Sequence, residues 1–126
     1  MNRYVDGFVL SVLNDRLEAY REMAAEAGTL WMDHGALAYF EGVGEDLEPE
    51  TDGTPIRTFP TLAETAADES VVFAFIEFES RAHRDEVNAA VMDDPAMDPE
   101  GFDGEMPFDP ERMAYGGFSS IVSYEA

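Results

Sequence analysis

Residues 70–79, SVVFAFIEFE, are the segment that most restricts how this chain can fold. Their β-branched and aromatic side chains predict a strand. Successive side chains of a strand point to opposite faces of the sheet. One face then carries Val71, Phe73 and Phe75, and the other carries Val72, Ala74, Ile76 and Phe78. Because both faces are apolar, both need to be covered.

Three further strands are predicted, at residues 3–12, 36–43 and 112–123, where β-branched and aromatic residues are again frequent. The segment after the second strand, GEDLEPETDGTPIRTFP, is rich in acids and turn formers and predicts a long surface loop. Residues 61–69 fit a short helical turn that leads into the central strand.

Two helices are expected between these strands. The first begins after Asn14, a predicted N-cap, and runs to about His34, where Gly35 closes it. The second begins after Ser80 and stops before Pro95. The order βαββαβ predicts an α+β fold of ferredoxin-like type over residues 1–126, with a four-stranded antiparallel sheet and both helices on one face. The other face is left for a second copy, which predicts a homodimer packed sheet against sheet.

The charge of the chain reports its environment more than its function. Its 28 acidic residues face seven Arg and no Lys, which gives a net charge of −21. Self-repulsion on this scale weakens at molar salt, where the Debye length is about 3 Å. Because the acids are spread along the whole chain, a halophilic cytoplasmic protein is predicted, with an acidic protein that binds a basic partner as the alternative.

Several classes of protein are excluded by composition. A nucleic-acid-binding protein needs a basic surface, which this chain lacks. The absence of Cys excludes disulfides and thiolate metal sites. Apolar runs of about eight residues are too short to span a membrane, which takes roughly 20. The start, MNRYVDGFVL, does not resemble a secretory signal.

The stretch SRAHRDEV, at residues 80–87, gathers cations at the start of the second predicted helix. On a helical wheel His83 points toward the sheet, Arg84 lies at the flank and Arg81 faces solvent. In a functional interpretation, His83 is an acid or base and Arg84 holds an anionic group at the rim of a pocket. In a structural interpretation, His83 is a hydrogen-bonded core residue and the arginines pair with nearby acids such as Asp85.

A second candidate segment, GEMPFDPERMAYGGF, lies at residues 104–118. Its Phe108, Met113 and Tyr115 can line an apolar cavity, with Asp109 and Arg112 as polar contacts, or the segment can simply close the sheet and shape the dimer contact. Gly116 and Gly117 allow a bulge or the close approach of another backbone. With two aromatic walls added, the candidate ligand-binding residues are Trp31, Phe75, Phe108, Asp109, Arg112 and Met113.

Three remaining polar residues have specific expectations. Asp6 lies in an apolar strand and needs a partner if it points inward, although the adjacent Gly7 suggests a bulge that turns it outward. His34 suits the negative end of a helix dipole. Because His34 and His83 lack a tight metal-ligand spacing, no metal site is predicted. No phosphate-binding glycine loop, nucleophile elbow or paired-carboxylate signature is present, and no cofactor is expected.

The chain resembles the YbaA-like family of the dimeric α/β-barrel superfamily. The resemblance is carried by YVDGFVLSV, LEAYREMA, HGALAYFEGVGED, VVFAFIEFESRAHRDEVNAAVMDDPAM and MPFDPERMAYGGF. It implies the ferredoxin-like fold and the dimer but no particular reaction. The wider superfamily includes cofactor-independent oxygenases, haem-degrading enzymes, isomerases and non-catalytic ligand binders, which is an analogy of fold alone.

Two hypotheses of function follow. In the first, a dimeric barrel binds a small, partly apolar molecule between sheet and helices, and is open to cofactor-independent oxygenase-like or isomerase-like chemistry. In the second, the protein is a non-catalytic dimeric module that binds a ligand or a protein. The sequence leaves open whether the protein is an enzyme.

Overall fold

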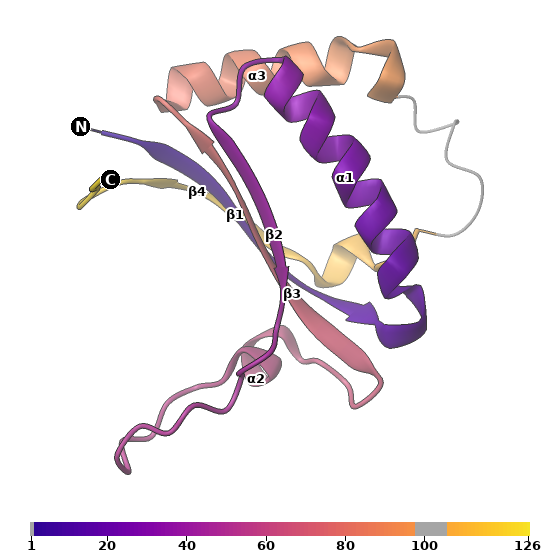
Figure 1. The fold of residues 1–126 in the computed structure, drawn as a ribbon, viewed down its shortest axis with the longest axis vertical. Helices are drawn as coiled ribbons and strands as arrows, with labels where there is room; N and C mark the ends of the chain where they lie inside the picture. Colours follow the sequence, from indigo (N-terminus) through magenta and orange to yellow (C-terminus); the bar gives the residue numbers. More distant parts are fainter. Residues whose placement is uncertain (1, 98–105) are drawn as a thin grey trace.

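A four-stranded antiparallel sheet forms the centre of the computed structural model, which describes residues 2–97 and 106–126 (Figure 1). Its strands lie in the order β2-β3-β1-β4. The long central pair is β1 with β3, and each edge strand pairs antiparallel with one of them. The strands are β1 (Tyr4–Leu13), β2 (Ala38–Val43), β3 (Glu69–Phe78) and β4 (Ala114–Ser119). This topology confirms the predicted ferredoxin-like fold.

The helices α1 (Leu17–Asp33) and α3 (Arg81–Asp93) cover one face of the sheet, which we call the inner face (Figure 1). The hydroxyl of Ser80 caps α3 by accepting a hydrogen bond from the backbone N–H of His83. After α1, Gly35 adopts a φ of 110°, which favours glycine. Both of these helix boundaries agree with the sequence prediction.

Asn14 does not cap α1 as predicted. It begins a 3-10 turn, Asn14–Arg16, that precedes the helix and carries no side-chain cap. The amide oxygen of Asn14 instead accepts a hydrogen bond from the hydroxyl of Ser70. The side chain therefore ties the end of β1 to the start of β3, and this cross-strand contact is not visible in the local sequence.

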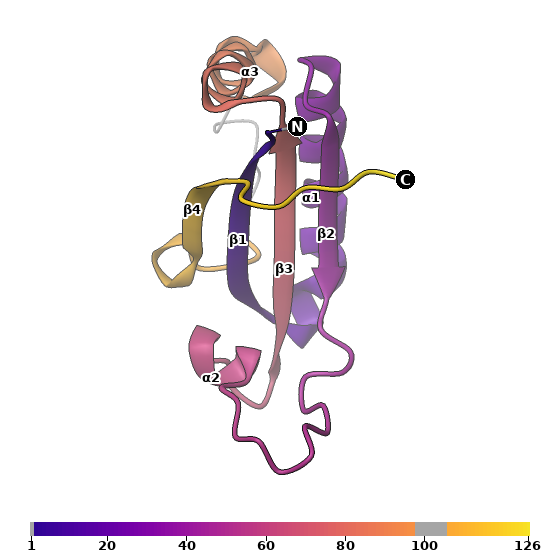
Figure 2. The same ribbon diagram turned by 90° about the vertical axis from the view of Figure 1, so that its left-hand side faces the viewer.

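The opposite face of the sheet, which we call the outer face, is covered only at its ends. Figure 2 looks onto this face, with α1 and α3 behind it. The short helix α2 (Phe59–Ala63) lies at one end, and the chain that follows β4 crosses near the other. The Ser11 hydroxyl, 2.8 Å from that of Thr65, joins the sheet to the segment after α2, and the Arg3 guanidinium binds Glu125.

The strand β3 divides its apolar side chains between the two faces as predicted. Val72, Ile76 and Phe78 are almost fully buried under the helices, where two apolar clusters form. Phe73 points to the outer face and is 44 % exposed. The outer face therefore remains partly uncovered in one copy of the chain.

The predicted glycine bulges are absent from the described strands. Pairing between β1 and β4 runs residue for residue from Tyr4 opposite Ser119 to Val9 opposite Ala114. Gly7 does not turn Asp6 outward, because the alternation of β1 continues through it. Gly117 provides space of a different kind: a Cβ there would collide with the hydroxyl of Tyr4.

Candidate ligand-binding site

A cavity of about 440 Å³ lies between the inner face of the sheet and the two long helices. We call it the inner cavity. Its volume falls within the usual range for small-molecule sites. Among the residues that line it are five methionines, Met23, Met92, Met97, Met106 and Met113. Its aromatic residues are Phe8, Tyr20, Trp31, Tyr39, Phe75, Phe108 and Tyr115. Methionine side chains are flexible and polarizable, so such walls adapt to apolar ligands of different shapes.

One end of the inner cavity holds a buried ion pair. Asp6 projects inward from β1, is only 1 % exposed, and lines the cavity. Its carboxylate lies 2.7 Å from Nη1 of Arg84 in the first turn of α3. Arg84 also donates from Nε to Asp85, at 2.8 Å. The charge of Asp6 is thus compensated by a cation that itself does not line the cavity.

Two tyrosines complete the surroundings of Arg84. The guanidinium carbon lies 5.0 Å from the ring centroid of Tyr4, a cation–π contact, and Nη1 lies 3.4 Å from the hydroxyl of Tyr115. Burial works against the charged form of Arg84, but Asp85 and Asp6 outweigh it and the pKa is raised. Burial and the nearby Asp6 raise the pKa of Tyr115, which keeps its hydroxyl protonated.

A second carboxylate, Glu41 of β2, lies on the opposite side of the inner cavity. It accepts a hydrogen bond from the hydroxyl of Tyr20 on α1 and another, of 2.6 Å, from that of Tyr39. Burial, followed by the bond to Glu41, raises the pKa of both phenols far above the ordinary value. Both tyrosines therefore remain donors, and Glu41 is held by neutral groups.

Trp31 is fixed in the cavity wall by its polar edge. Its indole N–H donates a 2.9 Å hydrogen bond to the side-chain oxygen of Asn88, which joins α1 to α3. Its ring lies 6.5 Å from that of Tyr39. Because Trp31 is the only tryptophan of the chain, its fluorescence reports on this cavity alone.

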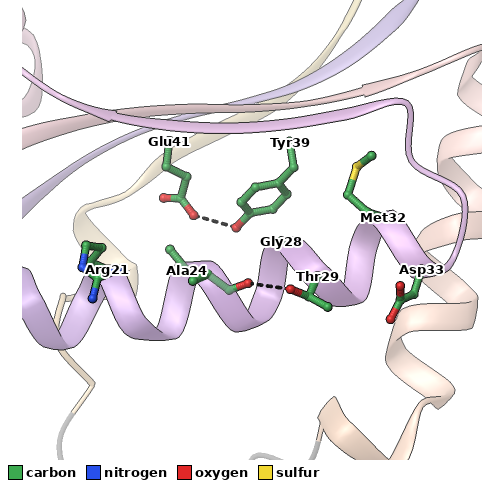
Figure 3. Close-up of a pocket in the computed structure, with 9 residues that line it drawn as sticks. Arg21, Ala24, Gly28, Thr29, Met32, Asp33, Tyr39 and Glu41 are labelled. Carbon is green, nitrogen blue, oxygen red and sulfur yellow. Dashed lines mark hydrogen bonds between the residues drawn. The ribbon is translucent and has the colours of Figure 1, made fainter.

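A groove of about 540 Å³ runs outside the inner cavity, along α1 and β2. Figure 3 shows Tyr39 and Glu41 reaching from β2 toward α1, with Gly28 opposite the Tyr39 ring. A Cβ at Gly28 would lie 2.9 Å from that ring, so glycine lets the two elements approach closely. Tyr39 and Glu41 also line the inner cavity, and they therefore form the partition between it and the groove.

Four of the six predicted ligand-binding residues border the inner cavity: Trp31, Phe75, Phe108 and Met113. The Phe108 ring packs edge-on against Tyr20 at 5.7 Å. Phe75 contributes less than expected, because its ring stacks on Phe40 at 5.3 Å on the outer face.

The two polar members of the predicted set lie elsewhere. Asp109 accepts a hydrogen bond from the backbone N–H of Glu111 and starts the 3-10 turn Pro110–Arg112. Arg112 donates to the carboxylate of Glu69 at 2.6 Å and to the carbonyl of Glu64. Neither residue lines the inner cavity. Asp109 thus shapes the segment before β4, and Arg112 links that segment to the region of Glu64 and Glu69.

The two predicted catalytic residues also lie outside the lining of the inner cavity. The Nδ1 atom of His83 accepts a hydrogen bond from the backbone N–H of Glu79, and its ring meets the edge of Phe78 at 5.9 Å. This placement corresponds to the structural interpretation of His83. Arg84 reaches the cavity only indirectly, through Asp6 and Tyr115, which line it.

The two carboxylates of the site were not identified as site residues from sequence. The sequence left open whether Asp6 points inward or is turned outward by a bulge, and its partner Arg84 lies 78 positions away, so no local pattern connects them. Glu41 had a usable signal, because it alternates with Tyr39 along a short strand and therefore shares its face. Together with the face of the first helix that carries Tyr20, this alternation would have placed Tyr20 and Tyr39 near the carboxylate of Glu41.

No group of three or more metal-ligating side chains occurs within residues 2–97 and 106–126. His34 lies 2.8 Å from a carboxylate oxygen of Asp94 and joins the ends of α1 and α3, instead of facing His83. A backbone hydrogen bond from Ala96, with help from His34, lowers the pKa of Asp94. The helices of the described part are also too short or too polar to cross a bilayer.

Comparison with known proteins places the chain in a family. Residues 3–110 match the model of a family described as a protein of unknown function, DUF1428. The chain belongs to the DUF1428 family. DUF1428 relatives include the uncharacterized protein YbaA of Escherichia coli K12 and that of Shigella flexneri. Each is 43 % identical over 120 residues, which cover 95 % of this chain and 97 % of the relative.

A solved structure resembles this DUF1428 member in fold. It is described as a dimeric ferredoxin-like protein from an uncultured marine organism, and it matches over the full length of both chains with a TM-score of 0.56. The sequence identity is 10 %, so the similarity concerns the fold alone.

Proposed function

We propose that the protein binds a small, largely apolar molecule in the inner cavity. The observation that carries this proposal is the cavity itself, about 440 Å³ lined mainly by methionines and aromatic rings beside two carboxylates. A packed core of this size would fill such a space with side chains, since interiors are close-packed and larger voids are few. Few polar groups in an apolar cavity are the usual pattern of a small-molecule site.

We favour binding over catalysis. His83, the group that sequence placed nearest to acid–base chemistry, accepts a backbone hydrogen bond outside the cavity lining. Asp6 is neutralised by Arg84, and Glu41 is held by two protonated tyrosines. These arrangements make the two carboxylates better suited to orienting a ligand than to exchanging protons with it.

The proposal is tested by placing a large side chain on α1 so that it fills the inner cavity. Ala27 lines the inner cavity, whereas the nearby Ala25 lines only the outside groove. An Ala27→Phe variant is expected to abolish binding of an apolar probe such as phenylbutanol, followed by Trp31 fluorescence. Ala25→Phe is the matched control and should bind like wild type. Equal binding by both variants would contradict a site in the inner cavity.

We also propose that two copies associate through the outer face. This face presents Phe40, Phe73 and Phe118, at 48 %, 44 % and 62 % exposure, on a chain of net charge −21. Two such chains repel each other wherever acidic surfaces meet, so a largely apolar face whose Glu77 is paired with Arg3 is the surface best suited to self-association. The solved ferredoxin-like structure is also described as dimeric, which supports self-association in general.

Light scattering in molar KCl tests the dimer. The expected mass is that of two 14.0 kDa chains. A single-chain mass at every concentration up to the solubility limit would contradict the proposed dimer, and it would leave the proposal for the inner cavity standing.

A further inference from the structure

We infer that the ligand of the inner cavity is an organic cation, an ammonium group on an apolar body, with Glu41 as its counter-ion. This inference rests on the proposed function, because it requires the inner cavity to be a binding site. It adds the charge and the orientation of the ligand. Four observations on the cavity wall carry it.

The first observation is the charge of the wall. The lining contains two carboxylates, Asp6 and Glu41, and no Arg or His among the described residues. Asp6 is paired with Arg84 at 2.7 Å, so its charge is compensated. Glu41 takes part in none of the ion pairs formed between described residues. Residues 98–105 contain no Arg, Lys or His that could supply one.

The second observation is how Glu41 is held. Its two neighbours, Tyr20 and Tyr39, donate hydrogen bonds and bring no positive charge. A carboxylate has about four acceptor positions, and two phenols occupy only half of them. The tyrosines thus fix the orientation of Glu41 while leaving it able to accept from a ligand. A half-buried carboxylate without a cation favours one from outside the chain.

The third observation is the group of aromatic residues that line the same cavity as this carboxylate. Tyr20, Trp31 and Tyr39 all line the cavity, and the rings of Trp31 and Tyr39 lie 6.5 Å apart. Aromatic faces attract ammonium groups, and Trp is the strongest of them. The wall around Glu41 therefore combines a counter-ion with rings suited to a cation.

The fourth observation separates the head of the ligand from its body. Apart from Asp6, the rest of the lining is mostly apolar, with five methionines and Phe108 among its members, and its polar groups on Asn88 and Tyr115 are uncharged. An ammonium at Glu41 with an apolar tail toward the methionines satisfies both parts of the cavity. An anionic ligand would lie against two carboxylates, which is unfavourable.

Three probes of the same shape and different charge test the inference: phenylbutylammonium, phenylbutanol and phenylbutyrate. Binding is followed by Trp31 fluorescence and calorimetry in KCl. The ammonium is expected to bind about tenfold or more tightly than the alcohol, a difference of roughly 1.4 kcal/mol, and the carboxylate more weakly than either. In Glu41→Gln the advantage of the ammonium over the alcohol should disappear, while binding of the alcohol stays the same.

Glu45→Gln is the matched control, because it removes one acidic charge from an exposed loop position and should keep the preference. Equal affinity of wild type for ammonium and alcohol would overturn the inference and leave the proposed function intact. The same holds if Glu41→Gln weakens all three probes alike, since Glu41 would then only shape the cavity. Failure of all three to bind wild type would overturn both.

Discussion

The two faces of the sheet are both rich in apolar residues, but they differ in where charged side chains lie. The inner face contains Asp6 and Glu41, and each carboxylate is held by specific partners. The centre of the outer face is formed by the stacked rings of Phe40 and Phe75, with Phe73 beside them. Directional polar groups suit a small ligand that must be oriented, whereas a plain aromatic surface suits a second protein surface. The difference supports separate roles for the two faces.

The largest expected effect is a loss of stability when the buried ion pair on the inner face is broken. In Arg84→Met the carboxylate of Asp6 stays buried without its cation, and breaking a buried pair in this way costs about 3–5 kcal/mol of unfolding free energy. Urea unfolding in molar KCl measures it. Arg81→Met, at an exposed position of the same helix, should change stability by about 0.5 kcal/mol or less.

A double variant distinguishes the loss of the pair from the loss of packing. Asp6→Leu combined with Arg84→Met removes both charges, and it should recover most of the stability lost in Arg84→Met alone. If the double variant is no more stable than the single one, the buried charge is not the cause.

The next largest effect is expected on dimerisation through the outer face. Phe73→Asp places a charge among aromatic rings that the proposed dimer buries, and we expect the dimer to dissociate about 30-fold more readily, as for a contact worth about 2 kcal/mol. Light scattering over a concentration series measures this change. Met32→Asp adds the same charge at a similarly exposed apolar residue on the helical side and should leave the dimer intact. Equal dissociation of both variants would remove the outer face as the interface.

Salt is expected to affect the two faces in opposite directions. Raising KCl from 0.1 M to 1 M shortens the Debye length from about 10 Å to about 3 Å. The proposed dimer should become tighter, because repulsion between two chains of charge −21 is screened. Binding of phenylbutylammonium should become weaker, since its attraction to Glu41 is screened as well. The same titration tests the predicted halophilic character, which requires the unfolding free energy to rise with salt.

The smallest effect concerns the link between α1 and α3 that lies outside both faces. The pKa of Asp94 in the folded chain is below its ordinary value of 3.8, because of the Ala96 backbone N–H and His34. A depressed carboxylate pKa contributes stability above 3.8, and the contribution is lost as pH falls through the folded value. Asp94→Asn should therefore lower the urea midpoint slightly at neutral pH, with the difference vanishing in acid. A constant difference at every pH would point to packing instead.

Local signals predicted most of the fold. The alternation in β3 placed Val72 and Phe73 on opposite faces, and Ser80 marked the start of α3 through its own hydrogen bond to the helix. These features depend on neighbours in sequence. Asn14 was misjudged because its side chain bonds across strands to Ser70.

The candidate site was less accessible to sequence because its parts come from distant elements. The wheel placed His83 correctly beside the buried Val87 and Val91, but its hydrogen bond to Glu79 fixes the ring away from the inner cavity. Apolar wall residues such as Trp31 and Met113 were among the residues predicted, since apolar side chains tend to be buried. Their polar companion Glu41 required knowledge of which face β2 turns inward.

The space that Gly117 leaves for Tyr4 has a consequence for variation within the DUF1428 family. Tyr4 stacks on Arg84, and any side chain at position 117 would occupy the volume of its hydroxyl. The two positions are therefore expected to change together: a relative with a larger residue at 117 should carry a smaller one at 4. Such coupled substitution would mark the neighbours of the Asp6–Arg84 pair in sequences whose structures have not been determined.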